Sequence, residues 1–179
     1  MKRTGPPEVE TVEAIRDWFA SDPSRMTMMA ARKFEVPEQE VVEALVGHWP
    51  ITRLRPGTFP AILEDFQALG PMRVFVRSKA AIMEAVGQFG GLSESGPFLN
   101  VQTETLDMHI LKDQVARAYA IEKIGHDSTI NTYSFQFFDP DGNAAFKAFL
   151  WDGYPDLPAP LIEQFHTLAR AYRQTESAG

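Results

Sequence analysis

The hydrophobic residues of this chain change their spacing at Gly70, and this change limits the folds open to the chain. Before Gly70, apolar side chains recur every three or four positions, which is typical of amphipathic helices. After Gly70 they alternate with polar residues, as in strands that bury one face. Helices followed by strands in this way predict an α+β fold rather than alternating strand–helix units.

The pattern predicts N-terminal helices, a set of strands that form a large antiparallel sheet, and a closing C-terminal helix. The helices are expected over 8–20, 25–34, 38–46, 60–69 and 161–173. The strands are expected over 72–77, 81–86, 98–102, 106–111, 119–123, 129–138 and 143–151, with a loop over 87–97. The last two strands should form a hairpin, because Asp139-Pro140-Asp141-Gly142 is a typical turn sequence.

Length and composition narrow the class of protein. The chain has 179 residues, which fits one compact unit made of a helical part (1–60) and a sheet domain with the closing helix (61–175). It has no cysteine, which excludes disulfides, zinc–thiolate and iron–sulfur sites, and a cysteine nucleophile. The net charge of -7 argues against broad binding to nucleic acids or anionic membranes. Without a long apolar run or a signal core, we expect a cytoplasmic protein that does not insert into membranes.

His109 is the strongest single candidate for a functional side chain. It lies in the middle of an expected strand, on the face opposite the apolar residues and close to Lys112. Such an imidazole could bind a ligand or act as an acid or base, or it could be a polar residue on a solvated sheet face. Arg73 and Arg77 on the first strand could likewise meet carboxylates or phosphates, or face solvent. The chain's 4 histidines show no metal-binding spacing.

Several segments, in order along the chain, resemble the HemS/ChuS/HmuS family of bacterial haem-binding and haemin-degrading proteins. They are 30–42, 69–78, Gly96–Val101 with Leu106–Ile110, and Ser134–Asp139 with Gly142 and Phe146-Lys147. These segments are similar to the family's helical opening, its first strand pair, its "gpWlNVld…fnlHLre" segment and its "SlqFFDa.G.AvhKvyl" segment. HemS-type proteins carry two such repeats. This chain is long enough for one, as in the related ChuX/HutX haem-utilisation proteins.

The resemblance implies a function as well as a fold. It implies helices packed on an antiparallel sheet, haem as the ligand, and a homodimer that rebuilds the two-repeat arrangement. It also implies a cytoplasmic haem carrier, store or delivery protein of haem uptake and iron utilisation. A haem transporter or a haem-degrading protein would then be its partner. The alternatives are a haem-degrading enzyme of the same family, and a non-haem interaction or regulatory module that kept the fold.

The resemblance also implies where haem would bind. His109 is expected at the haem iron, because ChuX-like chains carry a histidine implicated in haem binding at this place. The cations Arg73, Arg77 and Lys112 are expected to pair with the haem propionates, and Phe98 is expected to form part of an apolar wall, with Phe75 and Met83. The axial histidine of HemS proteins has no counterpart here. Its place falls near Arg25 or Met26, so Met26, His109 or a tyrosine such as Tyr133 would supply the iron ligand.

Overall fold

The computed structural model describes residues 8–126, 128–151 and 156–175. Three helices come first: α1 (Val9–Ser21), α2 (Thr27–Phe34) and α3 (Glu38–Leu45). A short strand and a helix follow, β1 (Ile51–Arg53) and α4 (Phe59–Asp65), and α4 continues as a 3₁₀ turn, η1 (Phe66–Leu69). The remaining elements are β2 (Pro71–Arg77), β3 (Ile82–Gln88), β4 (Ser93–Ser95), β5 (Phe98–Gln102), β6 (Asp107–Leu111), η2 (Lys112–Gln114), β7 (Arg117–Ile124), β8 (Asn131–Phe138), β9 (Ala144–Leu150) and α5 (Ala159–Ala171).

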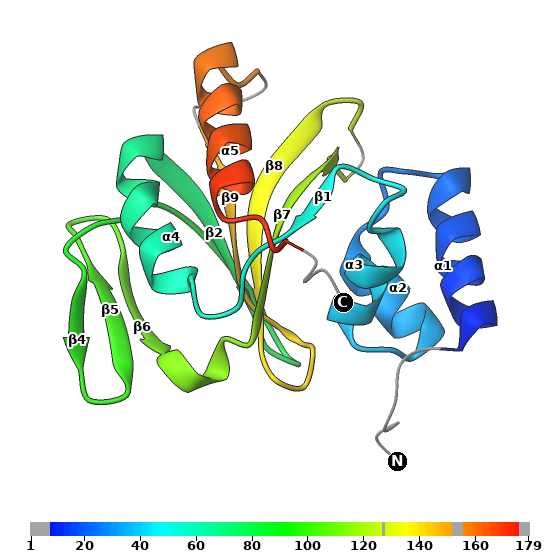
Figure 1. Cartoon of the computed structure of the whole chain (residues 1–179), viewed down its shortest axis with the longest axis horizontal. Coiled ribbons are helices and arrows are strands. Elements are labelled where there is room, and N and C mark those ends of the chain that lie inside the picture. Colours follow the sequence, from blue (N-terminus) through cyan, green and yellow to red (C-terminus); the bar gives the residue numbers. More distant parts are fainter. Residues whose placement is uncertain (1–7, 127, 152–155, 176–179) are drawn as a thin grey trace.

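The strands form two antiparallel sheets. Six of them pair in the order β1-β7-β8-β9-β2-β3, and three pair in the order β4-β5-β6 (Figure 1). The hairpin predicted at Asp139-Pro140-Asp141-Gly142 joins β8 to β9, with Gly142 in the left-handed region at a φ of 80°. The predicted α+β fold with a closing C-terminal helix is therefore confirmed, and three of its strands form a smaller sheet of their own.

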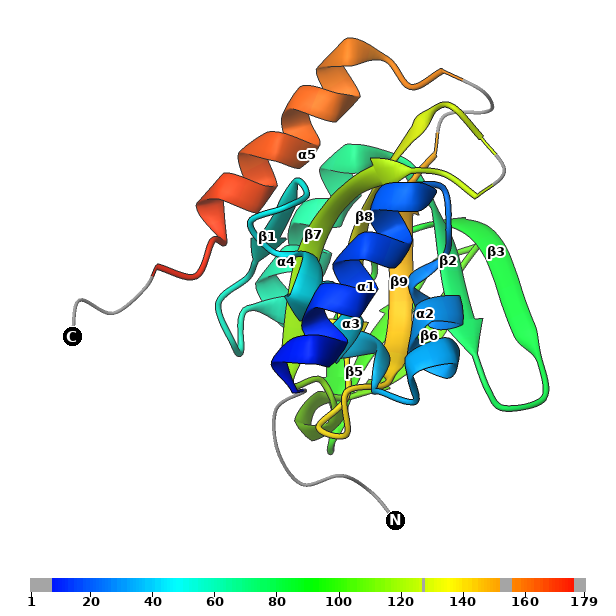
Figure 2. The same ribbon diagram turned by 90° about the vertical axis from the view of Figure 1, so that its right-hand side faces the viewer.

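Two hydrophobic cores lie on opposite faces of the six-stranded sheet. One core is built by α4, α5 and the inner face of the three-stranded sheet, around Phe66, Phe135 and Phe137. The other is built by α1–α3 around Phe19 and Phe138. Figure 2 shows α1–α3 lying across β7–β9, with α5 on the far side of the sheet. The alternation of the strands makes this possible, because successive side chains point to opposite faces.

Several predicted boundaries were wrong. The second helix begins at Thr27 rather than Arg25, because Ser24 bonds the carboxylate of Asp22 and prolongs the preceding turn. Part of the predicted loop over 87–97 is strand, since β3 extends to Gln88 and Ser93–Ser95 forms β4. Strand β1 pairs with β7, so the sheet takes in residues ahead of 60. No helix in the described part of the chain is long and apolar enough to cross a membrane.

Gly91 determines how the three-stranded sheet joins the rest of the fold. Its φ of +56° lies in the left-handed region, and a Cβ atom there would stand 2.1 Å from the backbone oxygen of Gln102. The chain makes a close turn between β3 and β4 at this point, and Gln102 N–H donates to the carbonyl of Gly90 at 3.2 Å. Only glycine allows both the positive φ and this close approach.

We expect Gly91→Ala to destabilise the protein far more than Gly96→Ala. Both glycines have a φ of +56°, but nothing lies within 4 Å of a Cβ at Gly96. The conformational cost of about 1 kcal/mol is common to both variants, and the clash should add about 1 to 3 kcal/mol at Gly91. Urea unfolding gives the two free energies of unfolding. An equal loss of free energy of unfolding in both variants would show that the close approach of the Gln102 backbone does not require glycine at position 91.

Candidate functional site

A cavity of about 300 Å³ lies between the start of α2 and the six-stranded sheet. Its floor is formed by two rows of residues that are direct neighbours across the strands. One row is Gln136, Lys147, Phe75 and Glu84, on β8, β9, β2 and β3, and the other includes Phe149 and Arg73. These residues all point to one face because they occupy alternate positions on their strands.

The walls of the cavity are largely apolar. Met26 and Met28 line it from the start of α2, and Trp151 and Leu157 line it beyond the end of β9. Ile130, which lies between β7 and β8, adds a further apolar side chain. An apolar cavity with a few polar groups on its floor is the usual form of a small-molecule site.

Three basic side chains face this cavity, Arg73, Lys123 and Lys147. The guanidinium of Arg73 stacks 4.0 Å from the ring centre of Trp151 and lies 3.7 Å from the carboxylate of Glu84. Burial, together with the charge of Lys147, lowers the pKa of Lys123 to about 8. Burial and the nearby charge of Lys147 both disfavour the protonated form of Lys123. An anionic ligand in the cavity would stabilise that protonated form.

Under the cavity, Glu38 at the start of α3 binds two of the sheet's cations. Its carboxylate accepts from Lys147 Nζ at 2.5 Å, from Arg77 Nη2 at 3.0 Å and from the Thr27 hydroxyl at 2.6 Å. The side chain of Glu38 is only 2% exposed. Burial alone would raise the pKa of Glu38, but Lys147, Thr27 and Arg77 hold it below its ordinary value.

Gln136 carries the one buried side-chain nitrogen or oxygen atom of the described residues that has no hydrogen-bond partner. Its Nε2 donates to Ser134 Oγ at 3.0 Å, whereas Oε1 is buried without a hydrogen-bond partner. The residue is 3% exposed and lines the cavity. An unpaired buried amide oxygen costs free energy, about 1–3 kcal/mol. The amide is therefore a polar group that a bound ligand could satisfy.

The structure brings some of the predicted site residues to this cavity. Met26 and Arg73 line it directly. Arg77 lies beneath it, joined to the cavity residue Lys147 through Glu38. Phe75, which was expected to form part of the apolar wall, also lines it, whereas Met83 on β3 is exposed.

The other predicted residues lie at the three-stranded sheet, His109 and Phe98 on its outer face and Lys112 at the start of η2, directly after β6. His109 stands opposite Asn100 in the β5–β6 pair, and the two side chains are 2.8 Å apart at Nδ1 and Oδ1. The Phe98 ring lies edge-on to His109, with centres 6.3 Å apart. Lys112 pairs with Glu94 at 2.5 Å. The His109 side chain is 56% exposed, and Nε2 lies 3.6 Å from the carboxylate of Asp107.

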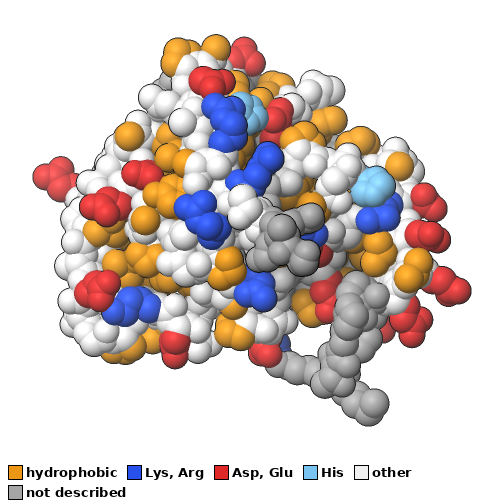
Figure 3. Space-filling view, viewed as in Figure 1, with side chains coloured by type: hydrophobic (Ala, Val, Ile, Leu, Met, Phe, Trp, Pro, Cys, Tyr) orange, Lys and Arg blue, Asp and Glu red, His pale blue; other side chains and the backbone are white. Residues whose placement is uncertain are grey.

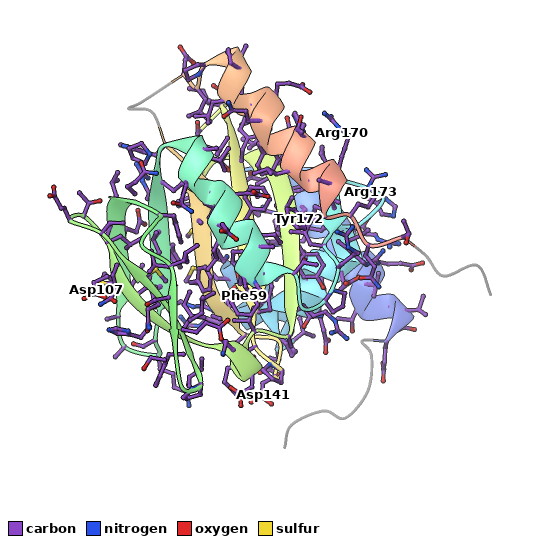
Figure 4. All side chains as sticks on the ribbon, turned by 60° about the vertical axis from the view of Figure 1, so that its left-hand side comes forward. Phe59, Asp107, Asp141, Arg170, Tyr172 and Arg173 are labelled. Atoms are coloured by element: carbon purple, nitrogen blue, oxygen red, sulfur yellow. The ribbon has the colours of Figure 1, made fainter. Side chains whose placement is uncertain are left out.

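The two groups of residues are far apart in one chain. Figure 1 places the three-stranded sheet and the N-terminal helices at opposite ends of the molecule. Figure 4 shows Asp107, the neighbour of His109, at the edge of the small sheet and well away from Arg170 and Arg173 near the end of α5. The described residues that line the cavity include none from β4, β5 or β6. A single copy of the chain therefore does not join His109 to Met26.

The surface is acidic at both ends of the molecule. Figure 3 shows acidic side chains over the N-terminal helices and over the end that carries the three-stranded sheet, in a chain with a net charge of -7. Among the described residues, no group of three or more histidine, cysteine, aspartate or glutamate side chains could hold a metal ion. The three basic residues of the cavity therefore stand out against an acidic protein.

Sequence reasoning missed Lys123, Lys147, Gln136 and Glu38. A signal was present for two of them, because Gln136 and Lys147 are polar residues inside strongly apolar strands. Gln136 lies between Phe135 and Phe137, all three of which are buried. Such residues need hydrogen-bond partners, which marks them as residues of a polar site or of a buried ion pair.

Comparison with known proteins decides the family. The family model described as "Haem utilisation ChuX/HutX" matches residues 52–168. The chain belongs to the ChuX/HutX haem-utilisation family. The resemblance seen in the sequence is thus confirmed. No curated protein matches this ChuX/HutX chain significantly.

Solved structures share the fold of this ChuX/HutX chain. A protein from Erwinia carotovora is 23% identical, with a TM-score of 0.80 over 89% of this chain and 98% of that one. The haem-binding protein ChuX is 23% identical, with a TM-score of 0.76 over 88% and 97%. Holo-PhuS, a haem-binding protein from Pseudomonas aeruginosa, is 24% identical, with a TM-score of 0.77 over 97% of this chain but 47% of PhuS. This chain thus corresponds to about half of PhuS.

We expect Glu38→Gln to destabilise the protein by about 3 kcal/mol at pH 7, because Lys147 and Arg77 lose their buried counter-charge. The pKa of Glu38 is lowered on folding, so its contribution is complete above the ordinary value of 4.5 and is lost as the pH falls through the folded pKa. The difference in the free energy of unfolding between the wild type and Glu38→Gln should therefore become smaller at acidic pH.

Urea unfolding at several pH values measures this difference. Glu163→Gln is the matched control, since Glu163 pairs with Arg170 on the exposed face of α5 and should change stability little. A loss in Glu38→Gln that stays constant down to acid pH would contradict the role of the ionised carboxylate.

Proposed function

We propose that this chain is a haem-binding protein of haem uptake and iron utilisation that carries, stores or delivers haem in the cytoplasm. Membership of the ChuX/HutX family supports this function, and two proteins of the same fold are described as haem-binding. The observation that carries the proposal is the cavity under α2, which joins an apolar wall to three basic side chains in an acidic protein. A haem transporter or a haem-degrading protein would then be its partner.

The cavity fits the chemistry of haem. Haem is a flat apolar macrocycle with two carboxylate groups and an iron that takes axial ligands. Phe75, Phe149 and the two methionines offer apolar surface, while Arg73, Lys123 and Lys147 offer cations to the propionates. The volume of about 300 Å³ is at the lower end for ligand sites, so the cavity would enclose one part of the macrocycle and leave the rest for a covering surface.

The iron ligands in this proposal come from two chains. Met26 lines the cavity and would supply a thioether on one side. His109 lies on β6, at the end of the molecule opposite the N-terminal helices. It would therefore reach the iron only as the partner's His109 in a homodimer. Strand β3 offers an edge for such pairing, because it is the last strand of its sheet and exposes Ile82, Met83 and Val86.

A haemin titration followed by absorbance tests the proposed function. We expect saturable binding of one haem per chain in the wild type and a changed Soret band in both Met26→Leu and His109→Ala. Arg73→Gln should bind about tenfold more weakly, because a charge-assisted contact with a propionate is lost. Arg32→Gln, an exposed change on α2 outside the cavity, is the matched control and should bind as the wild type does.

Weak association that does not saturate would refute haem binding and leave the non-haem interaction module as the function. Saturable haemin binding that is the same in the wild type and in all three variants would show that haem binds neither in the cavity nor at His109. Adding a reductant and air to the loaded protein separates the carrier from the haem-degrading enzyme. A carrier keeps its Soret band, whereas a degrading enzyme loses it and forms an open-chain tetrapyrrole.

The homodimer is tested by light scattering. We expect a mass of about 40 kDa, twice the 20.1 kDa of one chain. Introducing charge at the exposed β3 edge by Met83→Glu should shift the mass toward the monomer, because a desolvated carboxylate opposes strand pairing. Met29→Glu, an equally drastic change at an exposed methionine on α2, is the control. A monomeric wild type would remove the two-chain iron site.

A further inference from the structure

We propose that Asn100 is a positioning residue that holds the imidazole of His109 in one tautomer, with the proton on Nδ1 and a free lone pair on Nε2. The inference concerns the preparation of His109 as an iron ligand, and in that sense it rests on the proposed function. The tautomer of His109 can nevertheless be measured in the protein without haem, independently of that function.

The three-stranded sheet places three polar residues in one row. Ser93 on β4 stands directly opposite Asn100 on β5, and Asn100 stands directly opposite His109 on β6. Asn100 Nδ2 donates to Ser93 Oγ at 3.3 Å. The other end of the same amide, Oδ1, lies 2.8 Å from His109 Nδ1. Each side chain thus contacts the next one across the sheet.

The direction of these hydrogen bonds fixes the proton on His109. A carbonyl oxygen can only accept a hydrogen bond, so the ring nitrogen that faces Asn100 Oδ1 has to carry the proton. Ser93 Oγ accepts from the other end of the same amide, Nδ2, at 3.3 Å, so both ends of the amide have a partner in this orientation. In the neutral imidazole, the remaining nitrogen, Nε2, is then unprotonated.

Asn100 is buried and His109 is exposed, as expected for a buried residue that orients an exposed metal ligand. Asn100 is 6% exposed, so its amide is held within the sheet, whereas the His109 side chain is 56% exposed. The Phe98 ring stands edge-on to the imidazole on the same face, with ring centres 6.3 Å apart. The nearest charged group to Nε2 is the Asp107 carboxylate at 3.6 Å, beyond hydrogen-bond distance and 65% exposed.

This arrangement is the usual support of a histidine that binds a metal. Such histidines donate their second N–H to a carbonyl or a carboxylate, which fixes the tautomer and the direction of the lone pair. A histidine that was only solvated on a sheet face would need no buried acceptor behind it. The row Ser93–Asn100–His109 is therefore better explained as preparation of Nε2 for a metal-bearing ligand.

The test is ¹⁵N NMR of the histidine rings, without haem, at about pH 8.5, where an unperturbed histidine is neutral. In the wild type we expect His109 Nδ1 to be protonated and Nε2 to be unprotonated. Asn100→Leu removes the acceptor and should allow the tautomers to exchange, while Asn100→Asp keeps an acceptor and should preserve the pattern. The signals of His48 and His166 in the same spectra report whether the fold is intact.

A wild-type His109 that carries its proton on Nε2 would overturn the inference, as would an unchanged His109 pattern in a folded Asn100→Leu variant. The haemin titration gives the second readout. Asn100→Leu should bind haemin about 10- to 100-fold more weakly than Asn100→Asp. If the tautomer is as expected but haemin does not bind saturably to any form of the protein, the proposed function fails and the tautomer inference stands. If His109 binds haem while Asn100→Leu leaves its tautomer unchanged, only the inference fails.

Discussion

The buried carboxylate of Glu38 is the constraint on which the rest of the candidate site depends. Removing an ionised carboxylate from water is costly unless partners replace the lost hydration. Here the partners come from three other elements, Lys147 on β9, Arg77 on β2 and Thr27 on α2. The helices α2 and α3 are thereby held over one place on the sheet. The cavity is the space that this placement leaves between the start of α2 and the strands.

The same interaction explains the charge of the cavity. One carboxylate faces two cations at Glu38, so a positive charge remains beneath the floor. Its effect reaches Lys123, whose pKa falls to about 8 through burial and the charge of Lys147. A ligand that brings its own carboxylate would relieve this excess and could also satisfy the amide of Gln136. The packing of the helices and the basic character of the cavity floor therefore have one physical cause.

The sequence predicted the fold class because hydrophobic period is a local property. The change at Gly70 and the turn at Asp139-Pro140-Asp141-Gly142 each depend on a few neighbouring residues. Strand β4 was missed because its three residues are exposed and polar, and only pairing with β5 makes them a strand. The contribution of Lys147 was missed because alternation gives the face of a residue but not the Glu38 that comes to meet it from α3.

The separation of His109 from Met26 shows that one copy of the chain does not bring both expected iron ligands together. Both residues were expected at the haem, yet the fold places them at opposite ends, and the cavity holds room for only part of a macrocycle. This chain covers 47% of PhuS. In the proposed homodimer, a second copy of this chain would supply the additional surface. His109 is exposed on the outer face of the three-stranded sheet and contacts a buried asparagine on the neighbouring strand, which suits a ligand that is offered to another molecule.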